Sequence, residues 1–185
     1  MDTLKPKKGK LLVAEPSILN DSSFNRSVIL LTEHSGDSSI GFIMNKPLDL
    51  TIQDLIPEIN CSFCVHKGGP VEQDNLYFIH QLPKLIPNSI EVSNGIYWGG
   101  NFAALSDLLH NHEIPENKIR FFLGYSGWSS NQLQNEISEN SWFCIENTHG
   151  NIFELENNSF WKDHLLKIGG KYQLWANAPS DPKLN

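Results

Sequence analysis

The apolar residues of this chain occur in short runs of strand length, separated by residues that form turns. Runs of about 4–8 apolar and β-branched residues between Gly, Pro, Asn and Asp are typical of strands in antiparallel sheets. The turn-forming segment 35–39 lies between two such runs and indicates a hairpin. Strands are therefore expected at residues 10–14, 27–32, 40–44, 63–66, 76–80, 89–92, 119–123 and 142–145.

Apolar residues at helical spacing occur in further segments, and helices are expected at residues 52–59, 102–109, 130–140 and 160–168. The last of these helices is expected to end at Gly169-Gly170. The first helix is expected to begin at Thr51, which forms a capping box with Asp54. The second is expected to follow either Asn101 or the pair Asn94-Gly95, and the third to be capped by either Ser129 or Ser130.

The strands and helices do not alternate with the regular period of βαβ units. Many short strands with a few interspersed helices are typical of the α+β class. At 185 residues the chain has the size of one domain, and this domain is expected to cover residues 10–185. The segment before it, residues 1–9, is polar and basic and is expected to form a mobile arm.

The charge of the chain is unevenly distributed. The formal net charge is −7, from 14 basic and 21 acidic side chains. The first ten residues hold four of the lysines and one aspartate, so 10 basic and 20 acidic side chains remain in the rest. Because an acidic surface repels the phosphate backbone, general nucleic-acid binding is disfavoured. A DNA- or RNA-binding regulator would have to use the basic segment Lys5–Lys10.

Targeting signals and cysteine usage indicate a cytoplasmic protein. The basic start is not followed by the apolar region of a secretory signal. The longest apolar runs have the length of strands, so no membrane span is expected. Three cysteines are an odd number for a disulfide framework, and a reducing compartment fits them best.

Three linked stretches of the chain carry a family resemblance. The first extends from Gly9 to Pro47, the second is Gly68-Gly69-Pro70-Val71, and the third begins with Gly124-Tyr-Ser-Gly-Trp128. In this order and spacing the chain resembles the AlgH/YqgE family of small bacterial proteins over about residues 9–145. The motif positions to which we assign structural roles are Phe24, Ser27, Pro47, Pro70, Gly124, Tyr125, Gly127, Trp128, Gln132, Glu136 and Trp142.

The resemblance implies a fold and a family name, but no chemical activity. The fold is a bifurcated, mostly antiparallel β-sheet that forms a pseudo-barrel with flanking helices. Members carry the name of transcriptional regulator, while no molecular activity is established for the family, and no helix-turn-helix and no cofactor are implied. We therefore expect a non-enzymatic protein that acts through contacts with an unknown protein or small molecule.

Polar residues near the predicted hairpin form the candidate ligand site. A planar guanidinium holds carboxylates and phosphates, and the amides of a glycine pair accept anions. The alternative is internal use, in which Arg26 pairs with Glu33 or Glu136 and Asn45 caps a turn; this alternative is favoured because buried polar groups are normally satisfied within the protein. The candidate ligand-binding residues are Arg26, Glu33, His34, Asn45, Gly68 and Gly69.

Ser126 lies in a segment similar to the nucleophile elbow of α/β-hydrolases. The second glycine comes one place early, and the surrounding pattern lacks the alternating strands and helices of that fold. A strand-to-helix turn, in which glycine permits the tight turn and Trp128 packs the helix onto the sheet, is the favoured interpretation. A hydrolase therefore remains an alternative without a convincing catalytic set.

Cysteine and histidine residues provide the candidate metal ligands, but their spacing is unfavourable. Structural zinc sites usually have short ligand spacings on both sides, whereas the second half of this set lies far along the chain. A buried, inert Cys64 is favoured, and no metal or other cofactor is expected. The residues of this metal-dependent alternative are Cys61, Cys64, His66, Cys144 and His149.

Overall fold

The computed structural model describes residues 5–148, 152–154 and 159–178. The strands are β1 (Leu11–Ala14), β2 (Val28–His34), β3 (Ser38–Ile43), β4 (Pro47–Thr51), β5 (Cys64–Lys67), β6 (Val71–His80), β7 (Ile90–Ser93), β8 (Ile96–Trp98), β9 (Ile119–Ser129) and β10 (Trp142–Ile145). The α-helices are α1 (Ile52–Leu55), α2 (Phe102–His110), α3 (Gln132–Ser138), α4 (Ser159–Ile168) and α5 (Tyr172–Asn177). Short 3-10 helices cover Pro16–Asn20, Glu116–Lys118 and Ile152–Glu154.

The strands form one mostly antiparallel ten-stranded sheet that branches at β9. The main path has the order β10-β1-β2-β3-β9-β6-β8-β7. The first part of β9 lies between β6 and β5, and β5 is its parallel neighbour. The last part of β9 pairs with β3 instead, from Ser126 to Ser129. This branching agrees with the bifurcated sheet that was expected. The sheet is not closed, because its end strands β10 and β7 have no mutual pairing in the described residues.

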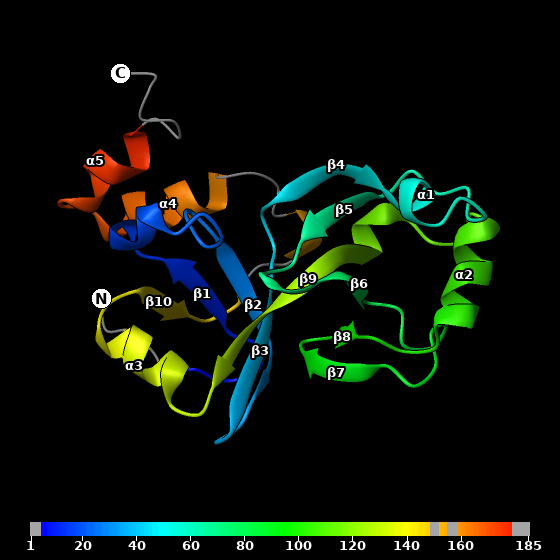
Figure 1. Cartoon of the computed structure of the whole chain (residues 1–185), viewed down its shortest axis with the longest axis horizontal. Coiled ribbons are helices and arrows are strands. Elements are labelled where there is room, and N and C mark those ends of the chain that lie inside the picture. Colours follow the sequence, from blue (N-terminus) through cyan, green and yellow to red (C-terminus); the bar gives the residue numbers. More distant parts are fainter. Residues whose placement is uncertain (1–4, 149–151, 155–158, 179–185) are drawn as a thin grey trace.

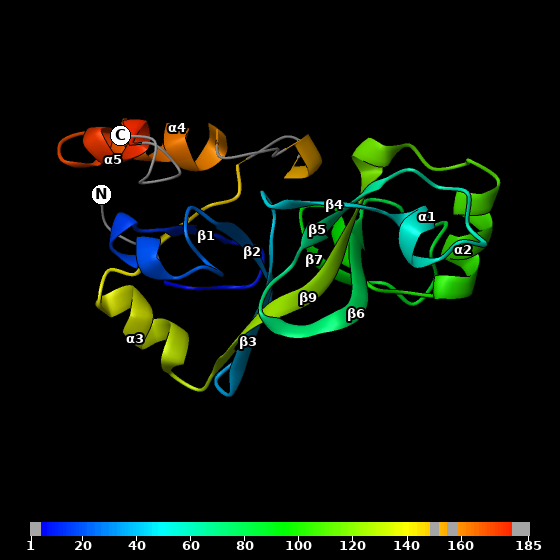
Figure 2. The same cartoon turned by 45° about the horizontal axis from the view of Figure 1, so that its top comes forward.

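Strand β9 runs between two groups of elements, with β1, β10, α3 and α4 in one and α1 and α2 in the other (Figures 1 and 2). The buried apolar residues form two clusters. The first is built mainly from β1, β2, β3 and β10 with side chains of α3, α4 and α5, and it extends to Ile79, Ile96 and Phe122. The second is built from β5, β6 and β9 with side chains of α1 and α2. Phe121 belongs to the second cluster and its neighbour Phe122 to the first, because successive residues of β9 point to opposite faces. Strand β9 therefore connects the two halves of the molecule.

Most of the expected strands and helices are present, and the hairpin expected from the turn at residues 35–39 is formed by β2 and β3. The first helix is only one turn long, and Thr51 donates its backbone N–H and its hydroxyl to Asp54 Oδ2, each over 2.7 Å. The expectation for the start of α3 was wrong. Asn131 occupies the N-cap in a left-handed conformation (φ 62°), and the Ser129 N–H and hydroxyl donate to Gln132 Oε1.

The segment Gly124–Trp128 was also misassigned, because it continues β9 rather than forming a strand-to-helix turn. Three elements were missed altogether: β4, β8 and α5. In the described part of the chain, none of the helices has the length and apolar character needed to cross a membrane.

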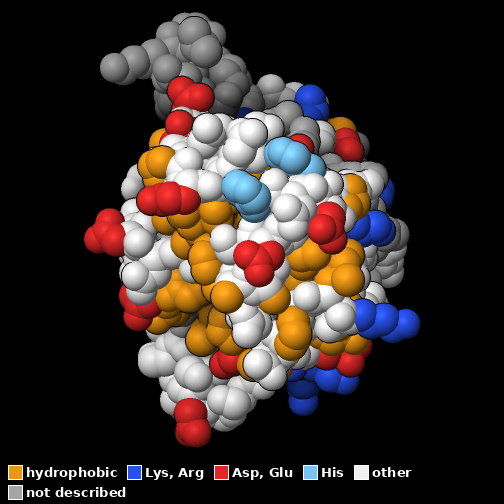
Figure 3. Space-filling view, turned by 90° about the vertical axis from the view of Figure 1, so that its right-hand side faces the viewer, with side chains coloured by type: hydrophobic (Ala, Val, Ile, Leu, Met, Phe, Trp, Pro, Cys, Tyr) orange, Lys and Arg blue, Asp and Glu red, His pale blue; other side chains and the backbone are white. Residues whose placement is uncertain are grey.

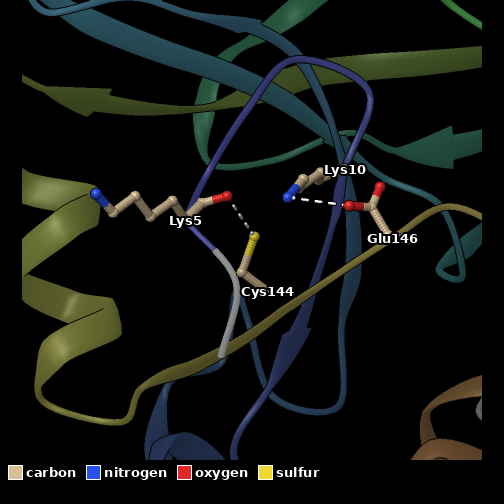
Figure 4. Close-up of polar contacts among 4 residues, drawn as sticks. All are labelled: Lys5, Lys10, Cys144 and Glu146. Atoms are coloured by element: carbon tan, nitrogen blue, oxygen red, sulfur yellow. Dashed lines mark hydrogen bonds and ion pairs between the residues drawn. The ribbon is translucent and has the colours of Figure 1, made fainter. Parts of the chain in front are cut away.

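Residues 5–9, expected to belong to a mobile arm, lie against the sheet; residues 1–4 are outside the described part. Pro6 and Gly9 are buried, and Gly9 N–H donates to Leu31 O over 2.7 Å. Cys144 Sγ contacts Lys5 O at 3.7 Å, and Lys10 forms a 3.1 Å ion pair with Glu146 (Figure 4). These contacts hold the basic segment beside β10.

Candidate functional site

The structure brings Arg26 and Asn45 of the candidate ligand site together. Asn45 Nδ2 donates to Arg26 O over 2.9 Å, and Asn45 Oδ1 accepts from Val28 N–H over 2.8 Å. Asn45 is buried, so its amide group joins the end of β3 to the start of β2. This use of the side chain is internal.

The guanidinium of Arg26 lies against the C-terminal helices. Arg26 Nη2 donates to Ala178 O over 2.8 Å, and the guanidinium carbon lies 5.1 Å from the ring centre of Trp161. Burial lowers the pKa of Arg26. Neither expected partner, Glu33 or Glu136, makes these contacts: Glu136 Oε2 instead accepts from the indole N–H groups of Trp128 and Trp142.

Glu33 and His34 lie at the opposite end of β2 from Arg26. A strand rises about 3.3 Å per residue, so about 20 Å separates the two ends. His34 is exposed, and its Nδ1 lies 2.8 Å from Ser39 Oγ. The six candidate residues therefore do not form one cluster.

Gly68 and Gly69 pack against the backbone of β9. Gly68 N–H donates to Leu123 O over 2.8 Å, while Gly68 O accepts from Ile43 N–H over 2.9 Å. A Cβ atom on Gly68 would lie 2.0 Å from Gly124 O, and one on Gly69 would lie 2.2 Å from the backbone of Tyr125. The glycines allow this close crossing, and the Gly68 amide is already in use.

Ser126 occupies a fully buried position within β9. Its hydroxyl donates to Gly68 O over 3.0 Å. A nucleophilic serine needs an exposed hydroxyl and an adjacent base, and this hydroxyl is enclosed where β9 meets Gly68. The position thus supports a role in packing.

The candidate metal ligands lie in different parts of the structure. Cys61 and Cys144 are only 4% and 1% exposed, whereas Cys64, expected to be buried, is half-buried and its thiol contacts Leu48 O. Cys144 lies on β10, in the half of the molecule opposite Cys61. Among the described residues, no three His, Cys, Asp or Glu side chains gather closely enough to hold a metal ion. His149 lies outside the described residues.

Burial controls the titration of these groups. Desolvation raises the pKa of the Cys144 thiol to about 11. Desolvation, together with the positive charge of Arg120, lowers the pKa of His66 to about 3. These directions disfavour a reactive thiolate at Cys144 and a charged imidazole at His66 near neutral pH.

An exposed apolar surface that sequence reasoning missed lies at the end of the molecule formed by β4, α1, β7 and α2 (Figure 3). We call it the end face. Ile90, Leu85 and Phe102 are 51%, 46% and 41% exposed there. They are close in the fold because Asn101 N–H donates to Pro87 O over 2.8 Å and Ile90 pairs with Trp98. The sequence feature that could have indicated this surface is the apolar pair Leu85-Ile86, of which only Ile86 is buried.

Acidic side chains lie on and around much of the end face, with Lys or Arg side chains along one edge of it (Figure 3). Residues 47–62 contain no Lys or Arg, residues 98–118 contain only Lys118, and the exposed Lys84 precedes Leu85. The excess of acidic side chains in these stretches attracts positive charge. The exposed acidic residues of the stretches 47–62 and 98–118 are Asp49, Asp54, Glu58, Asp107, Glu113 and Glu116.

Comparison with known proteins identifies the family. A family model described as AlgH-like (DUF179) matches residues 11–173. The chain belongs to the AlgH-like family. A UPF0301 protein of Bacteroides fragilis is 39% identical over 186 residues, covering 100% of this chain and 94% of that protein. A UPF0301 protein of Chlorobium chlorochromatii is 42% identical over 178 residues, covering 96% of this chain and 94% of that protein.

Solved structures share the AlgH-like fold. The crystal structure of protein DIP2367 from Corynebacterium diphtheriae matches with a TM-score of 0.75 and 22% identity, over 96% of this chain and 95% of that one. The solution structure of the AlgH protein from Pseudomonas aeruginosa matches with a TM-score of 0.72 and 22% identity, over 97% and 98%. The α+β fold expected from the sequence is thereby confirmed.

Proposed function

We propose that this AlgH-like protein is a non-enzymatic binding protein whose end face contacts a partner protein. The occupant is an amphipathic segment of the partner, with apolar side chains on one side and Lys or Arg at its edges. The observation that carries the proposal is the exposure of Leu85, Ile90 and Phe102, whose segments lie close together in the fold, at an end of the molecule with an excess of acidic side chains.

The apolar residues supply the affinity in this proposal. Contiguous exposed apolar side chains bounded by polar ones are typical of protein interaction sites. Each of the three large side chains is about half exposed, and covering that remaining area contributes on the order of 1 kcal/mol apiece. Large apolar anchors in a covered centre dominate the energy of many interfaces.

The acidic residues supply selectivity. Charge complementarity across an interface speeds association and rejects partners of the wrong sign. A basic segment is attracted to the end face, whereas the phosphate backbone of DNA or RNA is repelled from it. The transcriptional regulator role implied by the family resemblance would therefore act through a protein partner. The direct DNA- or RNA-binding alternative has only the basic segment Lys5–Lys10 in its favour.

We also propose that the protein is cytoplasmic. Cys61, Cys64 and Cys144 are free thiols. Reducing compartments keep cysteines in this state.

The test compares affinity capture from lysate of the native cell by three purified proteins: wild type, the end-face variant Leu85→Ser/Phe102→Ser, and the control Leu174→Ser. Leu174 is a matched control because it is 78% exposed and lies on α5. Circular dichroism first establishes that all three proteins are folded. Captured proteins are identified, and the binding segment of each is mapped and re-measured with purified components at low and high salt.

We expect wild type and the control to capture the same protein, and the end-face variant to bind it at least 10-fold more weakly. The binding segment of that protein should be basic and amphipathic, and its affinity should fall at high salt. Equal binding by the end-face variant overturns the proposal. An acidic binding segment also overturns it. Saturable, salt-resistant DNA or RNA binding by wild type would favour the alternative instead.

A further inference from the structure

A polar cleft lies where the basic segment meets the turn between β7 and β8. Its volume is about 530 Å³, within the range of small-molecule sites. Its residues come from three stretches of chain that are far apart in sequence. The lining residues are Lys7, Lys8, Gly9, Lys10, Glu91, Val92, Ser93, Asn94, Glu146 and Asn147.

We propose that this cleft binds a small phosphorylated sugar or polyol, with the phosphate at Lys7 and Lys8 and the hydroxyl groups at Asn94 and Glu91. This site is separate from the end face and does not depend on the proposed protein contact.

Two lysines are available for a phosphate. Lys10 is held by Glu146 at 3.1 Å (Figure 4), whereas Lys7 and Lys8 make no ion pair with any described residue. Phosphate forms strong, charge-assisted hydrogen bonds with ammonium groups. The anion would therefore bind beside Lys7 and Lys8 without displacing an existing partner.

The backbone of the basic segment holds these lysines in place. Lys10 N–H donates to Lys7 O over 3.1 Å, and Gly9 N–H donates to Leu31 O over 2.7 Å. Gly9 has a φ of 88°, and a Cβ atom on it would lie 2.4 Å from Ser93 Oγ. Only glycine allows the segment to turn and approach β7 this closely. A site formed in advance loses little entropy on binding.

The opposite wall is suited to hydroxyl groups. Ser93 Oγ is shielded from solvent where β7 packs against Gly9, so it is out of reach of a ligand. The exposed side chains of Asn94 and Glu91 form this wall instead. Asn94 offers a donor and an acceptor, and Glu91 offers acceptors.

The residues that line the cleft indicate which class of phosphate ester it would bind. Among the residues that the structure describes, no aromatic side chain lines the cleft, so these residues offer no stacking surface for a nucleotide base. Three lysines and two glutamates leave a local charge of only +1. That balance suits a single phosphate group with hydroxyls better than a polyphosphate or a nucleic-acid strand.

The test is a calorimetric and NMR titration of the full chain with glucose 6-phosphate, glycerol 3-phosphate, inorganic phosphate, glucose and AMP. The variant is Lys7→Gln/Lys8→Gln, and the control is Lys162→Gln, an exposed lysine on α4. The substituted lysines are at the surface or half-buried, so the fold is expected to persist, and circular dichroism checks it.

We expect saturable binding of at least one of the two phosphorylated polyols, with backbone shifts at residues 7–10, 91–94 and 146–147. Binding should weaken at least 10-fold in the double lysine variant and remain unchanged in Lys162→Gln.

Three outcomes overturn the proposal. The first is the absence of saturable binding by both phosphorylated polyols. The second is equal affinity in the double lysine variant or shifts confined to another surface. The third is tighter binding of AMP or of inorganic phosphate than of either phosphorylated polyol, which would exclude the ligand class.

Discussion

Trp128 and Trp142 donate their indole N–H groups to the same atom, Oε2 of Glu136, and each hydrogen bond is 2.8 Å long. The two rings also meet edge to face at 6.0 Å. Both indoles are buried, and one carboxylate on α3 therefore satisfies donors on β9 and β10. The carboxylate links the helix to two strands of the first apolar cluster.

Replacing Glu136 with Ala should destabilise the protein by about 2–3 kcal/mol, because two buried N–H donors lose their acceptor. Urea unfolding followed by circular dichroism measures the change in the free energy of unfolding. Glu139→Ala is the control, since Glu139 is exposed and surface substitutions usually change stability by less than about 0.5 kcal/mol. A loss for Glu136→Ala as small as that of the control would contradict the shared hydrogen bond.

Replacing Gly68 with Ala should cost about 3 kcal/mol or more, because the new Cβ would overlap the Gly124 carbonyl, a backbone atom that cannot rotate away. Gly36→Ala is the matched control, since no atom lies within 4 Å of a Cβ at that exposed position. Melting temperature and soluble yield report the difference. Equal stability of the two variants would mean that Gly68 does not pack against the backbone of β9 as described.

Replacing Ser126 with Ala should cost about 1 kcal/mol, the value of one buried hydrogen bond, here to Gly68 O. Since Ser126 is fully buried, a fluorophosphonate probe should leave it unmodified in the folded protein. Mass spectrometry of the labelled chain checks this. Stoichiometric modification of Ser126 would instead support the hydrolase alternative.

Acid should weaken the fold through His66. Burial and Arg120 lower the pKa of His66 to about 3 in the folded state, against about 6.5 in the unfolded chain. Above about pH 6.5 the imidazole is neutral in both states. Below it the unfolded state binds the proton first, so the free energy of unfolding falls as the pH decreases toward 3.

The contribution of His66 between about pH 7 and pH 5 should be about 2 kcal/mol. Urea unfolding at the two pH values should give a smaller loss for His66→Gln than for wild type. A residual loss is expected in the variant, because burial also lowers the pKa of His80 and His164. The exposed His110, substituted in the same way, serves as the control. An identical loss of unfolding free energy in wild type and His66→Gln would contradict the prediction, because it would mean that His66 has the same pKa in the folded and unfolded states.

Local sequence predicted the elements whose stability is local. The runs that became β1, β2 and β3 are apolar and β-branched, and turn residues separate them. The strand β4 was missed because its residues are mostly exposed, and its strand form comes from pairing with β5. The end of β9 was missed because Gly124 and Gly127 are typical of turns, whereas pairing with β6 at Tyr125 and with β3 from Ser126 onward continues the strand.

The contacts of the candidate ligand-binding residues could not be predicted, because their partners lie far away in the sequence. Arg26 was expected near Glu33 or Glu136, but its guanidinium reaches Trp161 and Ala178. Asn45 is next to Arg26 only because β2 and β3 pair. The cleft at Lys7 and Lys8 could not be predicted either, since its walls come from residues 7–10, 91–94 and 146–147, which are far apart in the sequence.

The sequence by itself determined the family, the α+β class and most of the strands, because motifs, apolar runs and turn residues act over a few positions. Only the tertiary structure decided which polar groups are used internally and which surfaces remain open. Those outcomes depend on hydrogen bonds and packing between residues far apart in the chain. The burial of Ser126 under Gly68 and the exposure of Phe102 at the end face are both of this kind.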